Sequence, residues 1–205
     1  MSEPPKTLTK LQSEKLLAAF DWERTGGAQS RKKIRNRCIT LLMLDAGLRV
    51  GEVVQLQMTD LYFNGQASDT IFVMASRSKS KTDREVPAST RLKRSLDTYL
   101  AEHLWLRDYA DATIVFGAGE SWHPMSTRQV ERIITSAGML MLGKPVNPHM
   151  LRHTCASRLM KVTNMRVVQQ LLGHRHITST QIYTHPDNDD RKKAVEDAEE
   201  HGNLI

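Results

Sequence analysis

The chain has 205 residues, 40% of them hydrophobic, and this length predicts one domain with short appendages. Its formal net charge is +6. Segment 187–200 holds seven acidic and three basic residues, a net of −4, so the rest of the chain carries +10. This balance favours a polyanionic partner. The sequence has no signal peptide and no apolar run of membrane-spanning length, which favours a cytoplasmic protein over a secreted or membrane-embedded one.

Metal and cofactor binding are not predicted. Cys38 and Cys155 lie in apolar helical patterns, apart from any cluster of Cys and His at zinc-ligand spacing. His149 and His153 are four residues apart, but Met150 stands where a zinc-protease helix has glutamate. We therefore expect no metal and no cofactor.

The first part of the chain predicts helices. Residues 1–7 are polar and proline-rich and are expected to form a flexible lead, after which Thr9 can cap a helix. Residues 24–31 have the composition of a loop. The apolar positions of the first helix are Leu11, Leu16, Leu17 and Phe20.

A buried helix is predicted for residues 34–46, ended by Gly47 in the left-handed conformation. A short helix over residues 50–56 follows. The basic residues around the start of the buried helix fit a solvated face or phosphate contacts equally well; they are Arg31, Lys32, Lys33, Arg35 and Arg37.

A β-hairpin is predicted next. Residues 70–75, "TIFVMA", have a strand-like composition, and the polar turn "SRSKSKTD" separates them from a second strand, "REVP". An amphipathic helix follows, with apolar positions Leu92, Leu96, Tyr99, Leu100 and Leu104.

The last third returns to helices after the loop "FGAGESWHPMS". Ser126 caps one helix, with Val130, Ile133, Ile134 and Ala137 on its apolar side. Asn147-Pro148 opens another with a core stripe of Leu151, Cys155 and Leu159, Asn164 caps a third that Gly173 ends, and a short final helix bears Tyr183. The predicted fold class is mostly α with a small antiparallel β-sheet (α+β).

The residues with reactive side chains gather in segment 149–185, "HMLRHTCASRLMKVTNMRVVQQLLGHRHITSTQIYTH". His149 and Arg152 are three residues apart and share one helix face. Metal-free phosphodiester cleavage requires a nucleophile, cations for the phosphate oxygens, a proton donor and a proton acceptor. Tyr183 can attack, and an arginine can hold two phosphate oxygens in a fixed fork.

Three motifs of this segment are His149-x-x-Arg152, Leu172-Gly173-His174 and Tyr183, and a fourth lies upstream, "LDAGLRVGEVVQL", residues 44–56. Gly47 ends one helix, and Arg49 emerges at the positive start of the next, where Glu52 can orient an arginine. Together the four motifs resemble the catalytic signature of the tyrosine recombinases, the phage integrase family of site-specific DNA recombinases. The resemblance covers the chain from about Leu8 to His185.

The resemblance implies the catalytic roles. Tyr183 is the nucleophile that forms a 3′-phosphotyrosine link without ATP, and Arg49 and Arg152 clamp the phosphate. His174 donates a hydrogen bond to the phosphate, and His149 accepts the tyrosine proton. His153 is expected to have only a packing or capping role.

The general acid of this family is a lysine in the β-hairpin turn. Aligning "R-x-V-P" with the corresponding strand of the family places Lys79 there, and a shorter turn would place Lys81 there instead. The lysine that is not the acid would contact the DNA backbone.

The resemblance assigns residues 8–186 to the catalytic domain and residues 187–205 to a tail, with a possible helix that docks on a neighbouring protomer. The N-terminal core-binding domain of most members is expected to be absent. The chain would then be an excised domain or a naturally short member, like the fimbrial phase-variation invertases.

The predicted function is site-specific recombination of double-stranded DNA by an enzyme that self-associates on DNA as a tetrameric synapse, with no membrane partner and no small-molecule substrate. One alternative is type IB topoisomerase-like nicking and rejoining. The other is a non-catalytic DNA-binding regulator. Neither the DNA target nor the choice between integration, excision, inversion and dimer resolution follows from the sequence.

Overall fold

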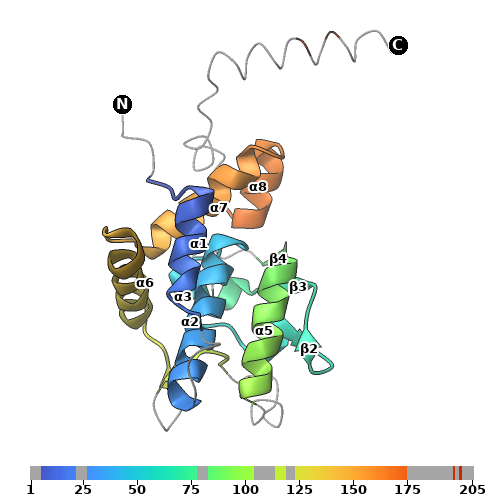
Figure 1. The fold of residues 1–205 in the computed structure, drawn as a ribbon. Helices are drawn as coiled ribbons and strands as arrows, with labels where there is room; N and C mark the ends of the chain where they lie inside the picture. Colours follow the sequence, from blue (N-terminus) through green and yellow to red (C-terminus); the bar gives the residue numbers. More distant parts are fainter. Residues whose placement is uncertain are drawn as a thin grey trace.

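The structure is a computed structural model of the chain, shown in Figure 1. Its helices form the body of the protein, and the short antiparallel strands of segment 62–87 lie to one side of them (Figure 1). The predicted class, mostly α with a small antiparallel β-sheet, is therefore confirmed. The residues that the structure describes are 6–21, 27–77, 83–103, 114–118, 123–174, 196 and 199.

Helix α1, Lys10–Ala18, begins with the predicted cap. The Thr9 hydroxyl accepts a hydrogen bond from the backbone N–H of Gln12, and the Gln12 side chain accepts one from the backbone N–H of Thr9. Leu16 and Leu17 are buried as predicted, but Leu11 is 65% exposed. Leu11 is therefore an apolar position of this helix that does not face the core.

Helix α2, Gly27–Leu44, begins before the predicted start at residue 34. The first two turns are polar, with an apolar stripe that starts only at Ile34, so hydrophobic periodicity could not reveal them. The prediction of a loop through residue 31 was wrong for this reason. From Cys38 to Leu44 every residue of α2 is buried, which makes its second half the centre of the core.

Two short helices follow the corner at Gly47, which has the predicted left-handed backbone at φ +66°. Helix α3 spans Val50–Val53 and is shorter than predicted, and helix α4 spans Met58–Leu61.

The predicted hairpin is present as strands β3, Thr70–Val73, and β4, Arg84–Pro87, which pair antiparallel with Thr70 opposite Pro87. A 3₁₀ turn, Ala75–Arg77, follows β3. The hairpin's turn at residues 78–82 lies outside the described residues.

Two further hairpins were not predicted. Strands β1, Tyr62–Phe63, and β2, Gln66–Ala67, flank Asn64-Gly65, and both turn residues have positive φ. Asn-Gly is the typical signal of such a turn, so the sequence held evidence for this hairpin. Strands β5, Gly117–Ala118, and β6, His123–Pro124, lie in the segment predicted to be a loop.

The remaining helices begin at side-chain caps. They are α5, Thr90–Glu102, α6, Thr127–Leu142, α7, Pro148–Met160, and α8, Met165–Leu172. The capping residues are Ser89, Ser126, Asn147 and Asn164, and the last three of these were predicted.

The packing brings distant segments together at one end of the molecule. Helix α2 contacts both α5 and α7, and α8 contacts both α7 and β4 (Figure 1). The Leu8 backbone N–H donates to the Thr154 hydroxyl at 2.9 Å, which ties the start of the chain to α7. Among the described helices, none is long and apolar enough to cross a membrane.

Candidate active site

The site is built around the corner between α2 and α3. Arg49 is the N-cap residue of α3, and its side chain is 27% exposed. The buried Glu52 carboxylate accepts hydrogen bonds from the Arg49 backbone N–H at 2.8 Å and from Arg49 Nη1 at 3.1 Å. The predicted contact between Glu52 and an arginine is therefore confirmed.

A second arginine, Arg84 on β4, binds the same carboxylate. Its Nη1 and Nη2 donate to the two Glu52 oxygens at 3.0 and 2.7 Å. Burial alone would raise the pKa of Glu52, but hydrogen bonds and charge from Arg84, with the hydrogen bond from Arg49 and the charge of Arg152, lower that pKa to about 2. Glu52 is thus a carboxylate at neutral pH.

Arg152 on α7 links two distant stretches of backbone. Its guanidinium donates to the carbonyl oxygen of Gly47 at the corner and, at 2.7 Å, to that of Leu172 at the end of α8. The Arg152 side chain is buried, and its helix neighbour Leu151 lies in the core, as predicted. Arg152 therefore holds the α2–α3 corner and the α8 terminus together.

His174 follows the end of α8, where Gly173 has φ +63°. The backbone N–H groups of Gly173 and His174 donate to the carbonyls of Gln170 and Gln169, which is a Schellman cap. Burial, with the nearby charges of Arg152, Arg49 and Arg84 acting in the same direction, lowers the pKa of His174 to about 4. These interactions bring His174, Arg152 and Arg49 into one electrostatic cluster.

His149 is linked to this cluster through His153. The two rings lie on α7 with their centroids 6.3 Å apart. Burial lowers the pKa of His153, as do the charges of His149 and Arg152, and His153 in turn lowers the pKa of His174. His153 was predicted to have only a packing or capping role. In the structure it also interacts electrostatically with two candidate catalytic histidines, His149 and His174.

A cleft of about 580 Å³ opens beside the cluster, between β4 and α8. Its lining includes Arg84, His174 and, on α8, Arg166 and Gln170. Asp83 and Glu85 also line this cleft, so both cations and acids face the space next to the cluster.

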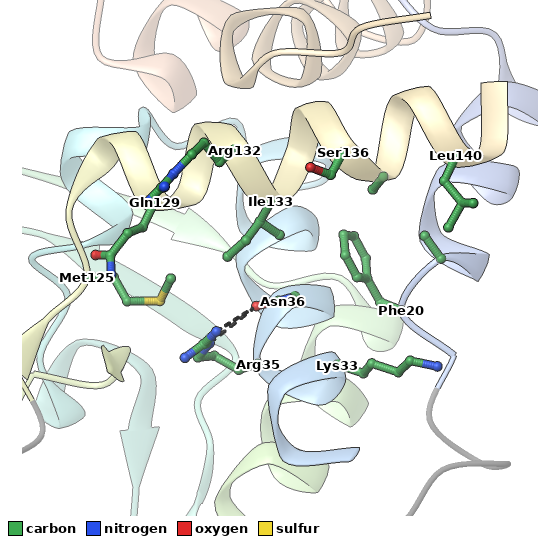
Figure 2. A pocket seen from close by; sticks show the side chains of 12 residues that line it. Phe20, Lys33, Arg35, Asn36, Met125, Gln129, Arg132, Ile133, Ser136 and Leu140 are labelled. Carbon is green, nitrogen blue, oxygen red and sulfur yellow. Dashed lines mark hydrogen bonds between the residues drawn. The ribbon is translucent and has the colours of Figure 1, made fainter. Parts of the chain in front are cut away.

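A second groove, of about 550 Å³, lies between α1, α2 and α6 (Figure 2). Figure 2 shows Phe20 and Ile133 lining it, with Arg35 and Lys33 along α2. Among the described residues that line this groove, none is an acid, histidine, cysteine or tyrosine. The groove therefore lacks a general base and a strong nucleophile, and the arginine–histidine cluster is the better candidate for chemistry.

Three predicted catalytic residues, Lys79, Lys81 and Tyr183, lie outside the described residues. Their roles stay predictions. Within the described chain, no group of three or more His, Cys, Asp or Glu is arranged to hold a metal ion.

Sequence reasoning missed Arg84. The strand "REVP" was used only to align the lysine, because its arginine had no recognised partner. The available signal was the alternation of the strand, which places Arg84 on its buried face. A buried arginine requires a buried partner such as a carboxylate.

Comparison with known proteins agrees with the site. Residues 6–190 match the model of the phage integrase family. The chain is 31% identical over 202 residues to the tyrosine recombinase XerA of Pyrococcus furiosus. A crystal structure of XerA recombinase superposes with a TM-score of 0.71 at 28% identity, and XerH recombinase in a pre-cleavage complex with its difH substrate superposes with a TM-score of 0.69 at 28% identity. The chain belongs to the phage integrase family of tyrosine recombinases.

The match covers nearly all of the chain but only part of each relative. The match to P. furiosus XerA covers 98% of this chain and 64% of XerA, and the match to the XerA crystal structure covers the same shares. The match to XerH covers 95% of this chain and 55% of XerH. The chain thus spans less than two thirds of the length of these relatives.

Proposed function

We propose that the chain cuts and rejoins double-stranded DNA at specific sites through a 3′-phosphotyrosine intermediate. The observation that carries the proposal is the cluster in which the charges of Arg49 and Arg152, from two distant segments, act on His174, from a third. Cations and hydrogen-bond donors held in advance around a phosphate stabilise the charge that develops as the phosphodiester is attacked.

Each residue has a stated role in this proposal. The Oη atom of Tyr183 attacks the scissile phosphorus and displaces the 5′ oxygen, while His149 accepts the tyrosine proton. Arg49 and Arg152 hold the non-bridging oxygens and His174 donates a hydrogen bond to one of them. Lys79, or Lys81 if the turn is shorter, protonates the 5′ oxygen.

Recombination then requires two DNA sites and several protomers. The freed 5′-hydroxyl attacks the phosphotyrosine of the partner duplex, and a tetramer on DNA coordinates the exchanges. XerH is a recombinase of similar fold whose structure contains its difH substrate, and this similarity supports DNA as the partner of this chain. We place this activity in the cytoplasm, where the free thiols of Cys38 and Cys155 are stable.

Covalent trapping on a suicide substrate tests the proposal. The substrate carries a nick close to the scissile phosphate, so the short 5′-hydroxyl fragment diffuses away after cleavage. We expect a protein–DNA adduct in the presence of EDTA, because the cations that act on the phosphate belong to the protein. The sequence of the suicide substrate is chosen from a random genomic library: the fragments that the protein traps covalently are sequenced.

Two results would contradict the proposal. Complete absence of an adduct from every DNA pool, with a folded protein that binds DNA, would indicate a regulator without cleavage. An adduct that forms only with a divalent metal would require a different mechanism. Relaxation of supercoiled DNA without any two-site product would restrict the activity to that of a topoisomerase.

A further inference from the structure

Arg84 makes contacts that the proposed reaction has not used. Its side chain is 5% exposed, and both terminal nitrogens donate to the Glu52 carboxylate, whose side chain is 2% exposed. Its third donor, Nε, binds the Leu171 carbonyl oxygen at 3.1 Å. One guanidinium on β4 thus holds α3 and the end of α8 at the same time.

The first arm of this arrangement reaches Arg49. Glu52 Oε1 accepts from Arg84 Nη1 and from Arg49 Nη1, and Glu52 Oε2 accepts from Arg84 Nη2 and from the Arg49 backbone N–H. Each carboxylate oxygen is therefore shared between the two arginines. Any rotation of Glu52 that loses Arg84 also moves the atoms that orient Arg49.

The second arm reaches the segment that carries His174. Leu171 and Leu172 are adjacent at the end of α8, and Arg84 binds the carbonyl of the first while Arg152 binds that of the second. A Cβ atom at Gly173 would lie 3.0 Å from Arg84 Cδ and 3.1 Å from its Nη1. The guanidinium therefore lies against a backbone position that only glycine leaves open.

We propose that Arg84 is a positioning residue that fixes Arg49, through Glu52, and the α8 terminus, through the Leu171 carbonyl, in the geometry that receives the phosphate. This inference rests on the proposed function. A lysine cannot replace it, because one ammonium group lacks the planar fork that meets two carboxylate oxygens and a carbonyl together. A buried ion pair adds little net stability over apolar side chains of similar size, so we assign Arg84 a role in orienting the site.

The test measures single-turnover cleavage of the suicide substrate by Arg84→Met and Arg84→Lys. The rate constant and the final fraction of protein in the adduct are recorded separately, with DNA affinity from fluorescence anisotropy. A misplaced clamp slows the reaction of every molecule, so we expect the rate constant to fall about 10- to 100-fold in both variants. We expect DNA affinity and the final adduct fraction to stay close to wild type.

Arg91→Met is the matched control. Arg91 also forms a bidentate pair, with Asp45, and a further bond to Glu14, but its side chain is 35% exposed whereas that of Arg84 is buried. We expect its rate constant to equal that of wild type, which shows that losing a bidentate pair does not by itself slow cleavage. In the Arg49→Lys variant, adding Arg84→Met should lower the rate constant by a much smaller factor than it does in wild type. The reason is that Arg84 acts largely through Arg49.

The outcomes separate this inference from the proposed function. No adduct with the wild-type chain contradicts the proposed function itself. A wild-type adduct with a normal rate constant in Arg84→Lys overturns the inference alone. A reduced adduct fraction with an unchanged rate constant also overturns it, because it would show that Arg84 only keeps molecules folded.

Discussion

Arginine side chains assemble the site in two different ways. Arg152 and Arg84 use their donors on backbone carbonyls and a buried carboxylate, and so connect α7, α8, β4 and the corner after α2. Arg49 is more exposed, and its guanidinium donates to the buried carboxylate of Glu52. The residue that meets solvent is thus oriented by a carboxylate that a buried arginine holds in place.

The low pKa of His174 predicts how stability depends on pH. Its ordinary pKa of 6.5 falls to about 4 in the folded protein, so the unfolded chain binds more protons between these values. Stability is therefore lost as pH falls through this window. Glu52, with a folded pKa of about 2, acts in the same direction at lower pH, below about 4.5.

The matching experiment compares wild type with His174→Gln by urea unfolding between about pH 7 and about pH 4.5. We expect the free energy of unfolding to fall more steeply with acid in wild type than in the variant, which lacks the titrating group. Parallel curves would show that burial and the arginine charges do not depress the pKa of His174.

The hairpin formed by β3 and β4 carries the candidate general acid in its turn. A 5′-bridging phosphorothioate leaves without protonation, so it should rescue a variant that lacks only the acid. We expect Lys79→Ala to be strongly impaired on ordinary DNA and largely restored on the sulfur substrate, with Lys81→Ala mildly impaired on both. Rescue of Lys81→Ala would exchange the two roles, and rescue of neither would leave both lysines as DNA contacts.

Close packing at the α2–α3 corner leads to a prediction about Gly47. A Cβ atom there would lie 2.5 Å from Leu172 Cδ2 and 3.2 Å from Cys155 Sγ, in a left-handed conformation. The conformation alone costs about 1–2 kcal/mol, and the contact with Leu172 adds to it. We expect Gly47→Ala to destabilise the protein by more than about 2 kcal/mol in urea unfolding.

Gly65→Ala is the control, because Gly65 has φ +74° and open space around its Cα. It should lose only the conformational part, about 1–2 kcal/mol. Equal losses in the two variants would show that α8 does not press on the corner.

Helix caps were the most predictable features. The polar start of a helix and a side chain whose partner is distant in the sequence were the least predictable. Ser126, Asn147 and Asn164 were correctly predicted to start helices because a cap is a local hydrogen bond. The start of α2 was missed because its first two turns have no apolar stripe. Arg84 was missed because its partner, Glu52, is 32 positions away, and only the fold brings the two together.

At the scale of the whole molecule, we propose that the acidic tail acts on other protomers. Residues 187–200 carry a net charge of −4, and Ala194, Val195 and Ala198 give only a thin apolar stripe. Such a segment is too short to form a stable helix alone, and docking on a neighbouring protomer would stabilise it.

Truncation after Pro186 tests the tail. We expect single-site cleavage of the suicide substrate to be unchanged, with reduced two-site recombination and weaker higher-order complexes on DNA. Equal loss of both activities would place the tail's contact within its own protomer. Full retention of both would make the tail dispensable.

The central claim is that Tyr183 attacks the phosphate that the arginine–histidine cluster holds. Mass spectrometry of the proteolysed adduct tests it most directly, with Tyr183→Phe as the matched variant, since phenylalanine keeps the ring and removes the nucleophilic oxygen. We expect a nucleotide attached to the peptide that contains Tyr183, with no adduct from Tyr183→Phe and DNA affinity within a few-fold of wild type. A nucleotide on Tyr62, Tyr99 or Tyr109, or an adduct formed by Tyr183→Phe, would contradict it.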